Sequence, residues 1–125
     1  MDQNWVYRRG DVYLADLDPV RGSEQGGTRP VVVLQNDVGN YYSDTIIVVP
    51  LTGRMKRLDL PVHVYMEKIR GLSRPSVAET EQLVRISKER VRNYLGRLTR
   101  EQMKRVEKAL LNSLGMPVPE CVEAP

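Results

Sequence analysis

A glycine-rich polar segment that ends in Arg29-Pro30 runs directly into four aliphatic residues, Val31 to Leu34. Three valines and a leucine in succession favour a buried strand, because β-branched side chains pack well on a pleated surface. Pro30 fixes its own φ angle and shifts Arg29 toward an extended conformation. The pattern predicts a polar loop over residues 18–30 that delivers one guanidinium to the edge of a rigid strand, where it is suited to binding a phosphate or a carboxylate.

Short apolar runs separated by turn residues continue along most of the chain. Besides residues 31–35, we expect strands over residues 11–17, 45–51, 62–66, 76–83 and 94–98. Asn36 to Asn40 is expected to be a turn-rich connection. Ser87 is expected to cap a short helical turn that ends near Val91.

The C-terminal part of the chain predicts one helix. Thr99 and Gln102 have the spacing of a capping box, and Gly115 can end the helix. An apolar stripe at spacings of three and four is formed by Met103, Val106, Leu110 and Leu114. Short strands followed by one helix indicate a small, strongly curved antiparallel sheet or barrel with one packed helix.

The length of 125 residues predicts a single domain, residues 1–125, with a core of about residues 8–115 and a flexible tail over 116–125. The net charge of +3 is compatible with a nucleic acid or an acidic protein partner, and it is also common in proteins that bind neither. The sequence contains no apolar run near the roughly 18 residues that suggest a membrane span, and the N-terminus lacks the apolar region of a secretory signal. We therefore expect a cytoplasmic protein.

Several kinds of catalytic site are poorly supported by the residues. Cys121 and His63 are the only cysteine and histidine, so a zinc site is not expected. His63 alternates with valines in an expected strand, which favours a structural or surface role over catalysis. The phosphate-binding loop and the nucleophile-elbow motif are both missing from the sequence. Asp16 and Asp18 are expected to be solvated turn carboxylates.

Two polar residues remain at the ends of apolar strands, Arg29 and Thr52. A polar side chain in such a position faces either a cleft or solvent. From the pattern alone, a surface ion pair for Arg29 and a turn role for Thr52 are open alternatives to a role in catalysis.

The residues around this arginine closely resemble the MazF/PemK/Kid toxin family. The resemblance covers about residues 8–115 and is carried by residues 9–17, 22–37, 50–52, 60–64 and 81–83. It implies an SH3-like antiparallel β-barrel with a C-terminal α-helix that acts as a homodimer. It also implies a ribosome-independent endoribonuclease that cuts single-stranded RNA at short sequences and leaves a 2′,3′-cyclic phosphate and a 5′-hydroxyl.

The resemblance places the catalytic arginine at Arg29 and the catalytic threonine at Thr52, and it implies no metal and no other cofactor. The expected partner is a small antitoxin whose acidic, disordered region wraps the dimer. We expect RNA contacts from two loops, through Glu24, Gln25, Thr28, Arg54, Lys56 and Arg57. For the three basic residues, an ordinary solvated loop is the alternative.

Some roles stay open at this stage. Glu24 can be the general base, an RNA contact or an ordinary solvated loop acid, and Arg29 can serve as the proton donor. Tyr41 and Tyr42 can either stack on bases or be buried at the barrel surface or the dimer surface. Many relatives have an arginine one position before Arg85, so the role of Arg85 is open. Toxins of the CcdB type share the fold but bind gyrase, and a non-catalytic toxin of that kind is the alternative function.

Overall fold

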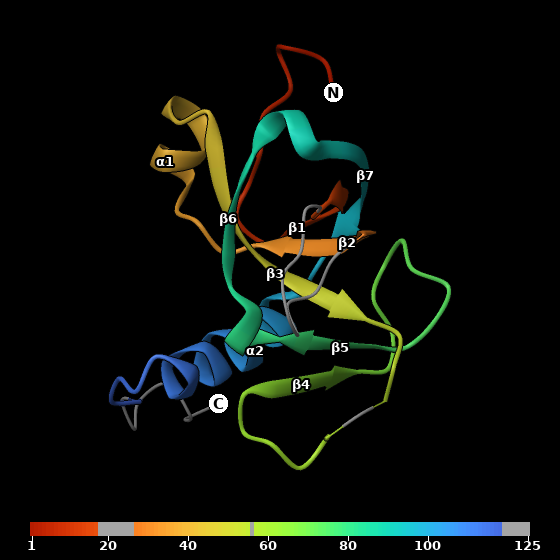
Figure 1. Cartoon of the computed structure of the whole chain (residues 1–125), viewed down its shortest axis with the longest axis vertical. Helices are drawn as coiled ribbons and strands as arrows, with labels where there is room; N and C mark the ends of the chain where they lie inside the picture. The colour runs from red at the N-terminus through yellow and green to blue at the C-terminus, as the bar shows by residue number, and fades with distance from the viewer. Residues whose placement is uncertain (18–26, 56, 119–125) are drawn as a thin grey trace.

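A computed structural model describes residues 1–17, 27–55 and 57–118 (Figure 1). Its strands are β1 (Asp11–Asp16), β2 (Thr28–Val33), β3 (Thr45–Thr52), β4 (His63–Met66), β5 (Ser76–Glu79), β6 (Val84–Ser87) and β7 (Val91–Arg97). Its helices are α1 (Asp37–Tyr42), α2 (Arg100–Ser113) and two single-turn 3-10 helices, η1 (Thr80–Gln82) and η2 (Lys88–Arg90). The expected mainly-β fold with a C-terminal helix is confirmed. In the ranges described, no helix is long and apolar enough to cross a membrane.

The strands form one curved antiparallel sheet in the order β4-β5-β3-β2-β1-β7. β3 is the longest strand and has partners on both edges. One edge pairs with β2, and the other is shared: residues Thr45 to Val48 pair with β6, while Leu51 and Thr52 pair with β5. No pairing joins β4 to β7 within the described residues, so the barrel-like sheet is not closed.

The two faces of the sheet carry separate core clusters. The cluster beneath α2 consists of Val12, Val32, Leu34, Val49, Leu51, Val64, Met66, Ile69, Ala78, Leu98, Met103, Val106 and Ala109. The second cluster, here called the far-side cluster, consists of Tyr7, Tyr13, Ala15, Val31, Val33, Ile46, Val48, Ile86 and Val91. Successive residues of β2 and β3 alternate between the two clusters, as the two-residue period of a strand requires. The continuous valine run is therefore buried on both sides.

Helix α2 begins and ends as the sequence predicts. The hydroxyl of Thr99 accepts a hydrogen bond from the amide of Gln102 at 3.1 Å, and the Gln102 side chain accepts one from the Thr99 amide at 2.9 Å. This is the predicted capping box. Gly115 follows the helix with a φ of +69°, a conformation that ends helices and favours glycine.

The predicted apolar stripe of α2 needs one correction. Met103, Val106 and Ala109 are the buried residues of the helix, and Leu110 packs partly against the core. Leu114 is 54% exposed, so its assignment to the stripe is wrong. The helical segment ends at Ser113, and Leu114 is the capping residue beyond its last turn.

Three further sequence predictions differ from the structure. The segment 76–83 is not one strand, because β5 ends at Glu79 and the 3-10 helix η1 follows. β5 pairs with the C-terminal end of β3, whereas β6, which begins after η1, pairs with its N-terminal half. Residues 36–40 contain the start of α1, because the Asn36 side chain accepts a hydrogen bond from the Gly39 amide at 2.8 Å and caps a helix. Strand β2 begins at Thr28 rather than residue 31, because β1 extends alongside it.

Candidate active site

Arg29 and Thr52 lie on neighbouring strands near the same end of the sheet. β2 and β3 pair through Val33 opposite Val48 and Val31 opposite Pro50. Two more residues in this register lead to Arg29 on β2 and Thr52 on β3. The β2–β3 pairing itself ends at Val31 and Pro50, and beyond it Arg29 pairs with Ala15 of β1 while Thr52 pairs with Val77 of β5. The two sequence-predicted catalytic residues thus occupy corresponding positions at the ends of neighbouring strands, although they are distant in sequence.

The side chains of these two residues face the same side of the sheet. Val31 and Val33 belong to the far-side cluster, and Arg29 follows their two-residue period on β2. Ile46 and Val48 belong to the same cluster, and Thr52 follows their period on β3. Arg29 and Thr52 therefore face away from α2, at the margin of the far-side cluster.

Thr52 is 6% exposed and well ordered by its neighbours. Its backbone pairs with Val77 of β5, and its hydroxyl accepts a hydrogen bond from the amide of Arg54 at 3.2 Å. Because the Arg54 amide is the donor, the hydroxyl proton of Thr52 remains available for an acceptor such as a phosphate oxygen. Arg54 itself is exposed immediately after the strand.

The loop after β3 carries a second exposed arginine in a constrained position. Arg57 has a φ of +50°, the only positive value for a non-glycine residue in the described part of the chain. Its guanidinium forms an ion pair with Asp59 at 3.2 Å. Hydrogen bonding from Arg57 lowers the pKa of Asp59, and the same bond raises the pKa of Arg57. Among the described residues of the predicted loop, Arg54 and Arg57 are thus both exposed, and the Arg54 amide binds the Thr52 hydroxyl.

The other predicted RNA contacts are only partly described. Thr28 lies at the start of β2, opposite Asp16 on β1. Glu24, Gln25 and Lys56 lie outside the described residues. Asp16 forms an ion pair with Arg92 at 3.3 Å, which differs from the expected solvated carboxylate, and Asp18 also lies outside the described residues.

Two residues left open by the sequence have defined positions. Tyr41 and Tyr42 are exposed on α1 and contact each other edge to face, with ring centroids 4.8 Å apart, so burial is wrong for both within this chain. Arg85 is exposed on β6 opposite Ile47. Since Ile86 belongs to the far-side cluster, Arg85 faces the opposite side of the sheet from Arg29.

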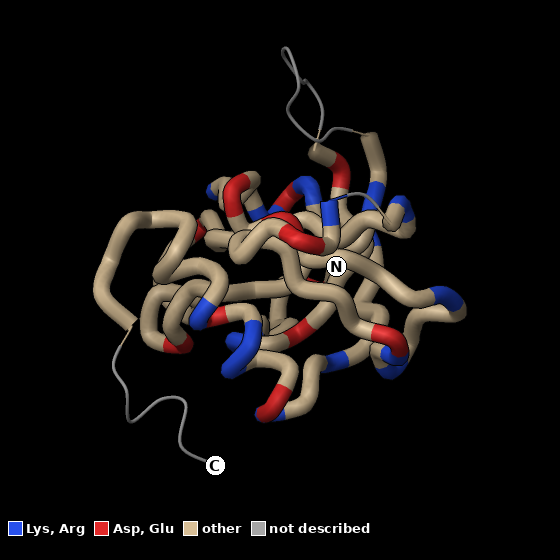
Figure 2. The backbone as a smooth tube through the Cα atoms, turned by 90° about the horizontal axis from the view of Figure 1, so that it is seen from below, with Lys and Arg blue, Asp and Glu red and all other residues tan. Residues whose placement is uncertain are grey.

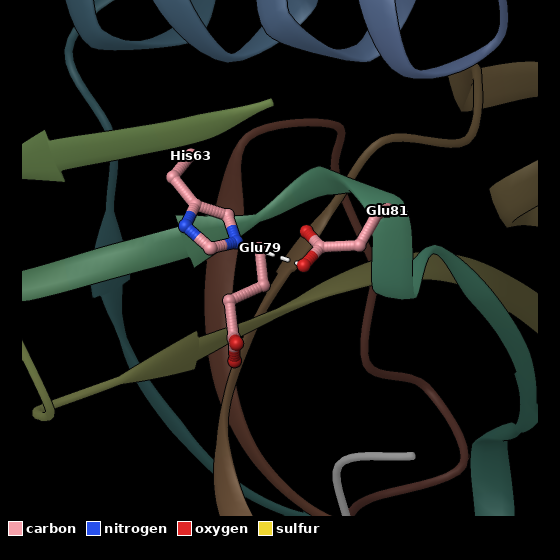
Figure 3. A group of neighbouring side chains, drawn as sticks. All are labelled: His63, Glu79 and Glu81. Carbon is pink, nitrogen blue, oxygen red and sulfur yellow. Dashed lines mark hydrogen bonds and ion pairs between the residues drawn. The ribbon is translucent and has the colours of Figure 1, made fainter. Parts of the chain in front are cut away.

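A polar group formed by His63, Glu79 and Glu81 was not predicted from the sequence (Figure 3). These residues come from β4, β5 and η1, and one ligand atom of each lies within 4.8 Å of the others. Nε2 of His63 lies 2.8 Å from Oε2 of Glu81. Glu79 is 2% exposed. The signal in the sequence was the pair of glutamates that interrupts an otherwise strand-like run.

The donor types in this group also occur in metal sites, and among the described residues it is the one such cluster. In the observed arrangement, however, Nε2 of His63 is engaged by a carboxylate at hydrogen-bond distance.

Lysines, arginines and acidic residues are interspersed around the backbone rather than gathered on one side (Figure 2). Net charge alone therefore does not mark the site.

Comparisons with known proteins identify the family of the chain. The family model of the PemK-like, MazF-like toxins of type II toxin–antitoxin systems matches residues 8–114. The chain belongs to this family. It is 51% identical over 112 residues to Endoribonuclease MazF of Staphylococcus saprophyticus, an alignment that covers 89% of this chain and 93% of that protein.

Solved structures of the same kind share the fold. MazF of Deinococcus radiodurans superposes with a TM-score of 0.79 at 25% identity, over 90% of this chain and all of that chain (100%). A mycobacterial endoribonuclease, solved in complex with its cognate antitoxin, superposes with a TM-score of 0.71 at 25% identity, over 91% of this chain and 98% of that chain. The predicted endoribonuclease toxin is confirmed at the level of the family, and the comparisons give no support to the gyrase-binding alternative.

Proposed function

We propose that this toxin cleaves single-stranded RNA at short specific sequences, without a ribosome and without a metal ion, through attack by a ribose 2′-hydroxyl. Arg29 and Thr52 are the catalytic residues in this proposal. The observation that carries it is the register of β2 and β3, which directs both side chains to one face at one end of the sheet.

Cleavage of this kind requires three events. The 2′-oxygen bonds to phosphorus, the bond from phosphorus to the 5′-oxygen breaks, and a proton moves from the 2′-hydroxyl to a base while another reaches the leaving oxygen. The products are a 2′,3′-cyclic phosphate and a 5′-hydroxyl. The protein therefore has to stabilise the extra negative charge on the phosphate and to provide proton transfer.

Arg29 is suited to stabilising this charge. Its guanidinium can donate two parallel hydrogen bonds to phosphate oxygens. The Thr52 hydroxyl, which already accepts from the Arg54 amide, can donate to a third oxygen and fix the orientation of the phosphate. Glu24 remains the candidate general base, with Arg29 as the candidate proton donor.

Sequence recognition is assigned to the loops that flank these strands. Unpaired bases are accessible to side chains in single-stranded RNA, whereas the grooves of an RNA helix expose little sequence information. Arg54, whose amide binds the Thr52 hydroxyl, and Arg57, farther along the same loop, are both exposed and can contact phosphates. Thr28 at the start of β2, together with Glu24, Gln25 and Lys56, completes the proposed contact surface.

We also propose that the toxin acts in the cytoplasm as a homodimer bound by a cognate acidic antitoxin. The support is the mycobacterial relative, whose structure was solved with its antitoxin, together with the net charge of +3. An acidic segment that folds on binding would lie over the same arginines as RNA, so the two ligands would compete.

The proposal is tested with purified protein and a long single-stranded RNA in the presence of EDTA. We expect discrete cuts with cyclic phosphate ends. Arg29→Ala should lower kcat by roughly 10²–10³, the usual effect of removing one charge-stabilising donor. Arg100→Ala, which removes an exposed arginine at the start of α2, is the matched control and should cleave normally. Intact RNA with the wild-type protein, or undiminished cleavage by Arg29→Ala, would contradict the proposal.

A further inference from the structure

Each of the two ring nitrogens of His63 lies at hydrogen-bond distance from an oxygen atom. Nδ1 lies 2.9 Å from the carbonyl oxygen of Arg57, and Nε2 lies 2.8 Å from a carboxylate oxygen of Glu81. The side chain is only 4% exposed, so water has little access to it. The ring therefore joins the loop after β3 to η1, two segments that are distant in sequence.

The chemistry of the two partners determines the protonation of the ring. A backbone carbonyl accepts hydrogen bonds and cannot donate, and an ionised carboxylate such as that of a glutamate is likewise an acceptor only. Both ring nitrogens of His63 must then donate, and only the imidazolium form has two N–H groups. A neutral ring would leave one nitrogen lone pair facing an acceptor oxygen.

The carbonyl that receives the Nδ1 proton belongs to a strained turn. Arg57 has a φ of +50°, a left-handed conformation that is unfavourable for a residue other than glycine. The turn of residues 57–60, here called the Arg57 turn, is closed by a hydrogen bond from the Leu60 amide to the same Arg57 oxygen at 3.2 Å. Such strain persists only where the surroundings fix the conformation, and His63 supplies a second donor there.

Charged groups surround the ring on several elements. Glu79 lies directly opposite His63 in the pairing of β4 and β5, and Glu81 contacts it from η1. Asp59 lies close enough for the charge of the ring to affect its pKa. From α2, Arg105 and Lys108 line a cavity of about 280 Å³ that His63 also lines.

The balance of these effects favours the charged ring. Burial lowers the pKa of His63, but hydrogen bonds with Glu81 and Arg57 and the negative charges of Glu81 and Glu79 raise it by more. The net pKa lies above its ordinary value of 6.5. A raised pKa agrees with the two N–H groups that the contacts of the ring require.

We propose that His63, as an imidazolium, is a positioning residue for RNA binding: it fixes the strained Arg57 turn by bridging the Arg57 carbonyl and the Glu81 carboxylate, and loss of its proton breaks this bridge and loosens the turn. The part that concerns RNA rests on the proposed function, in which Arg57 contacts phosphate. His63 itself contacts no reacting atom. It acts through the backbone that presents Arg57.

The protonation state is tested first, without RNA. The chain contains one histidine, so its imidazole resonances in an NMR titration need no assignment by mutation. We expect both ring nitrogens to be protonated at about pH 6.5, and the pKa to fall in Glu81→Gln, whose amide can accept or donate. Hydrogen exchange at the Leu60 amide should accelerate as the ring loses its proton. A neutral ring at about pH 6.5, or a Leu60 amide indifferent to titration, would overturn the proposal.

The role in binding is tested by the pH profile of RNA cleavage. In the wild-type protein, KM should rise roughly tenfold as pH passes through the measured pKa of His63, the factor expected from loss of one charge-assisted hydrogen bond. In Glu81→Gln this rise should vanish, because the amide can pair with either form of the ring, and kcat should be unchanged. An identical KM profile in both proteins would show that His63 does not position the RNA-binding surface.

Two further measurements distinguish a proton from a metal ion at this group. His63→Asn keeps a donor for the Arg57 carbonyl and removes the titration, so its KM should be independent of pH. Added zinc chloride should leave the His63 resonances unchanged; if zinc shifts them and lowers KM, a cation rather than a proton bridges the group and the proposal fails.

If the wild-type protein cuts no RNA, the proposed function fails, and the NMR titration still decides the protonation of His63.

Discussion

A Cβ atom placed on Gly96 would lie 2.0 Å from the carbonyl oxygen of Arg70. The loop after β4 thus passes directly over β7, close enough that neither backbone leaves room for a side chain. Gly71 makes the reciprocal approach, with its Cβ position 1.8 Å from the carbonyl oxygen of Leu95. This contact helps to fix the loop that connects β4 to β5 against β7, the strand at the opposite edge of the sheet.

Gly96→Ala should therefore be strongly destabilising. The methyl group can be accommodated only if one backbone segment moves, and overpacking of this kind costs about 1–3 kcal/mol or more. Gly53→Ala is the control, because no heavy atom lies within 4 Å of its Cβ position. Urea denaturation followed by circular dichroism compares the two variants. Equal unfolding free energies would show that the two segments separate easily.

The hydroxyl of Tyr13 is a second test of stability. It accepts a hydrogen bond from the Trp5 indole at 2.7 Å and donates one to the buried carboxylate of Asp11 at 2.8 Å. Tyr13→Phe leaves both partners short of one bond and should cost about 1–3 kcal/mol. Tyr42→Phe, at a ring that is 79% exposed, should cost almost nothing. Fluorescence of Trp5, the only tryptophan, should report the change directly.

Two replacements of Thr52 distinguish the role of its hydroxyl group from the role of its side-chain volume. Thr52→Val keeps the volume of the side chain, removes the proposed donor to phosphate, and frees the Arg54 amide from its hydrogen bond. We expect kcat to fall by about ten- to a hundredfold, the loss of one hydrogen bond to the charged phosphate in the transition state. Thr52→Ser retains the hydroxyl and should keep most of the activity. Single-turnover cleavage of a short RNA measures both; equal loss in the two variants would assign the effect to packing.

The stability of the fold should depend on pH through His63. Its pKa in the folded protein is raised above the ordinary value of 6.5, so the folded state binds the proton more tightly than the unfolded chain. The stabilisation is fully present below pH 6.5 and is lost as pH rises through the folded-state pKa. Thermal unfolding across this range should show the loss in the wild-type protein and not in His63→Asn. A parallel decline in both would assign the effect to other groups.

Competition between RNA and an acidic peptide tests the proposed regulation. A synthetic acidic segment should inhibit cleavage by raising KM while kcat stays constant, because both ligands would occupy the surface near Arg54 and Arg57. Raised salt should weaken both interactions. Simultaneous tight binding of peptide and RNA, measured by fluorescence anisotropy with one labelled ligand, would contradict a shared surface.

Much of the fold follows from local chemistry. The valine run at residues 31–34 is buried because its residue types fit only a two-sided strand, and the capping box at Thr99 and Gln102 forms because its two side chains satisfy neighbouring amides. The sequence predictions were wrong where a partner strand decided the outcome. β2 begins at Thr28 because β1 is long enough to pair with it, and residues 76–83 divide because the two halves of β3 need different partners.

The sequence by itself determined the family, the mainly-β class with a C-terminal helix, and the choice of Arg29 and Thr52 as candidate residues. These depend on residue types and short spacings, which are properties of the chain alone. Only the tertiary structure decided that β2 and β3 direct both residues to one face, and that His63 lies between Arg57 and Glu81. Both relationships join segments that are distant in sequence, so they depend on strand register and packing rather than on any local pattern.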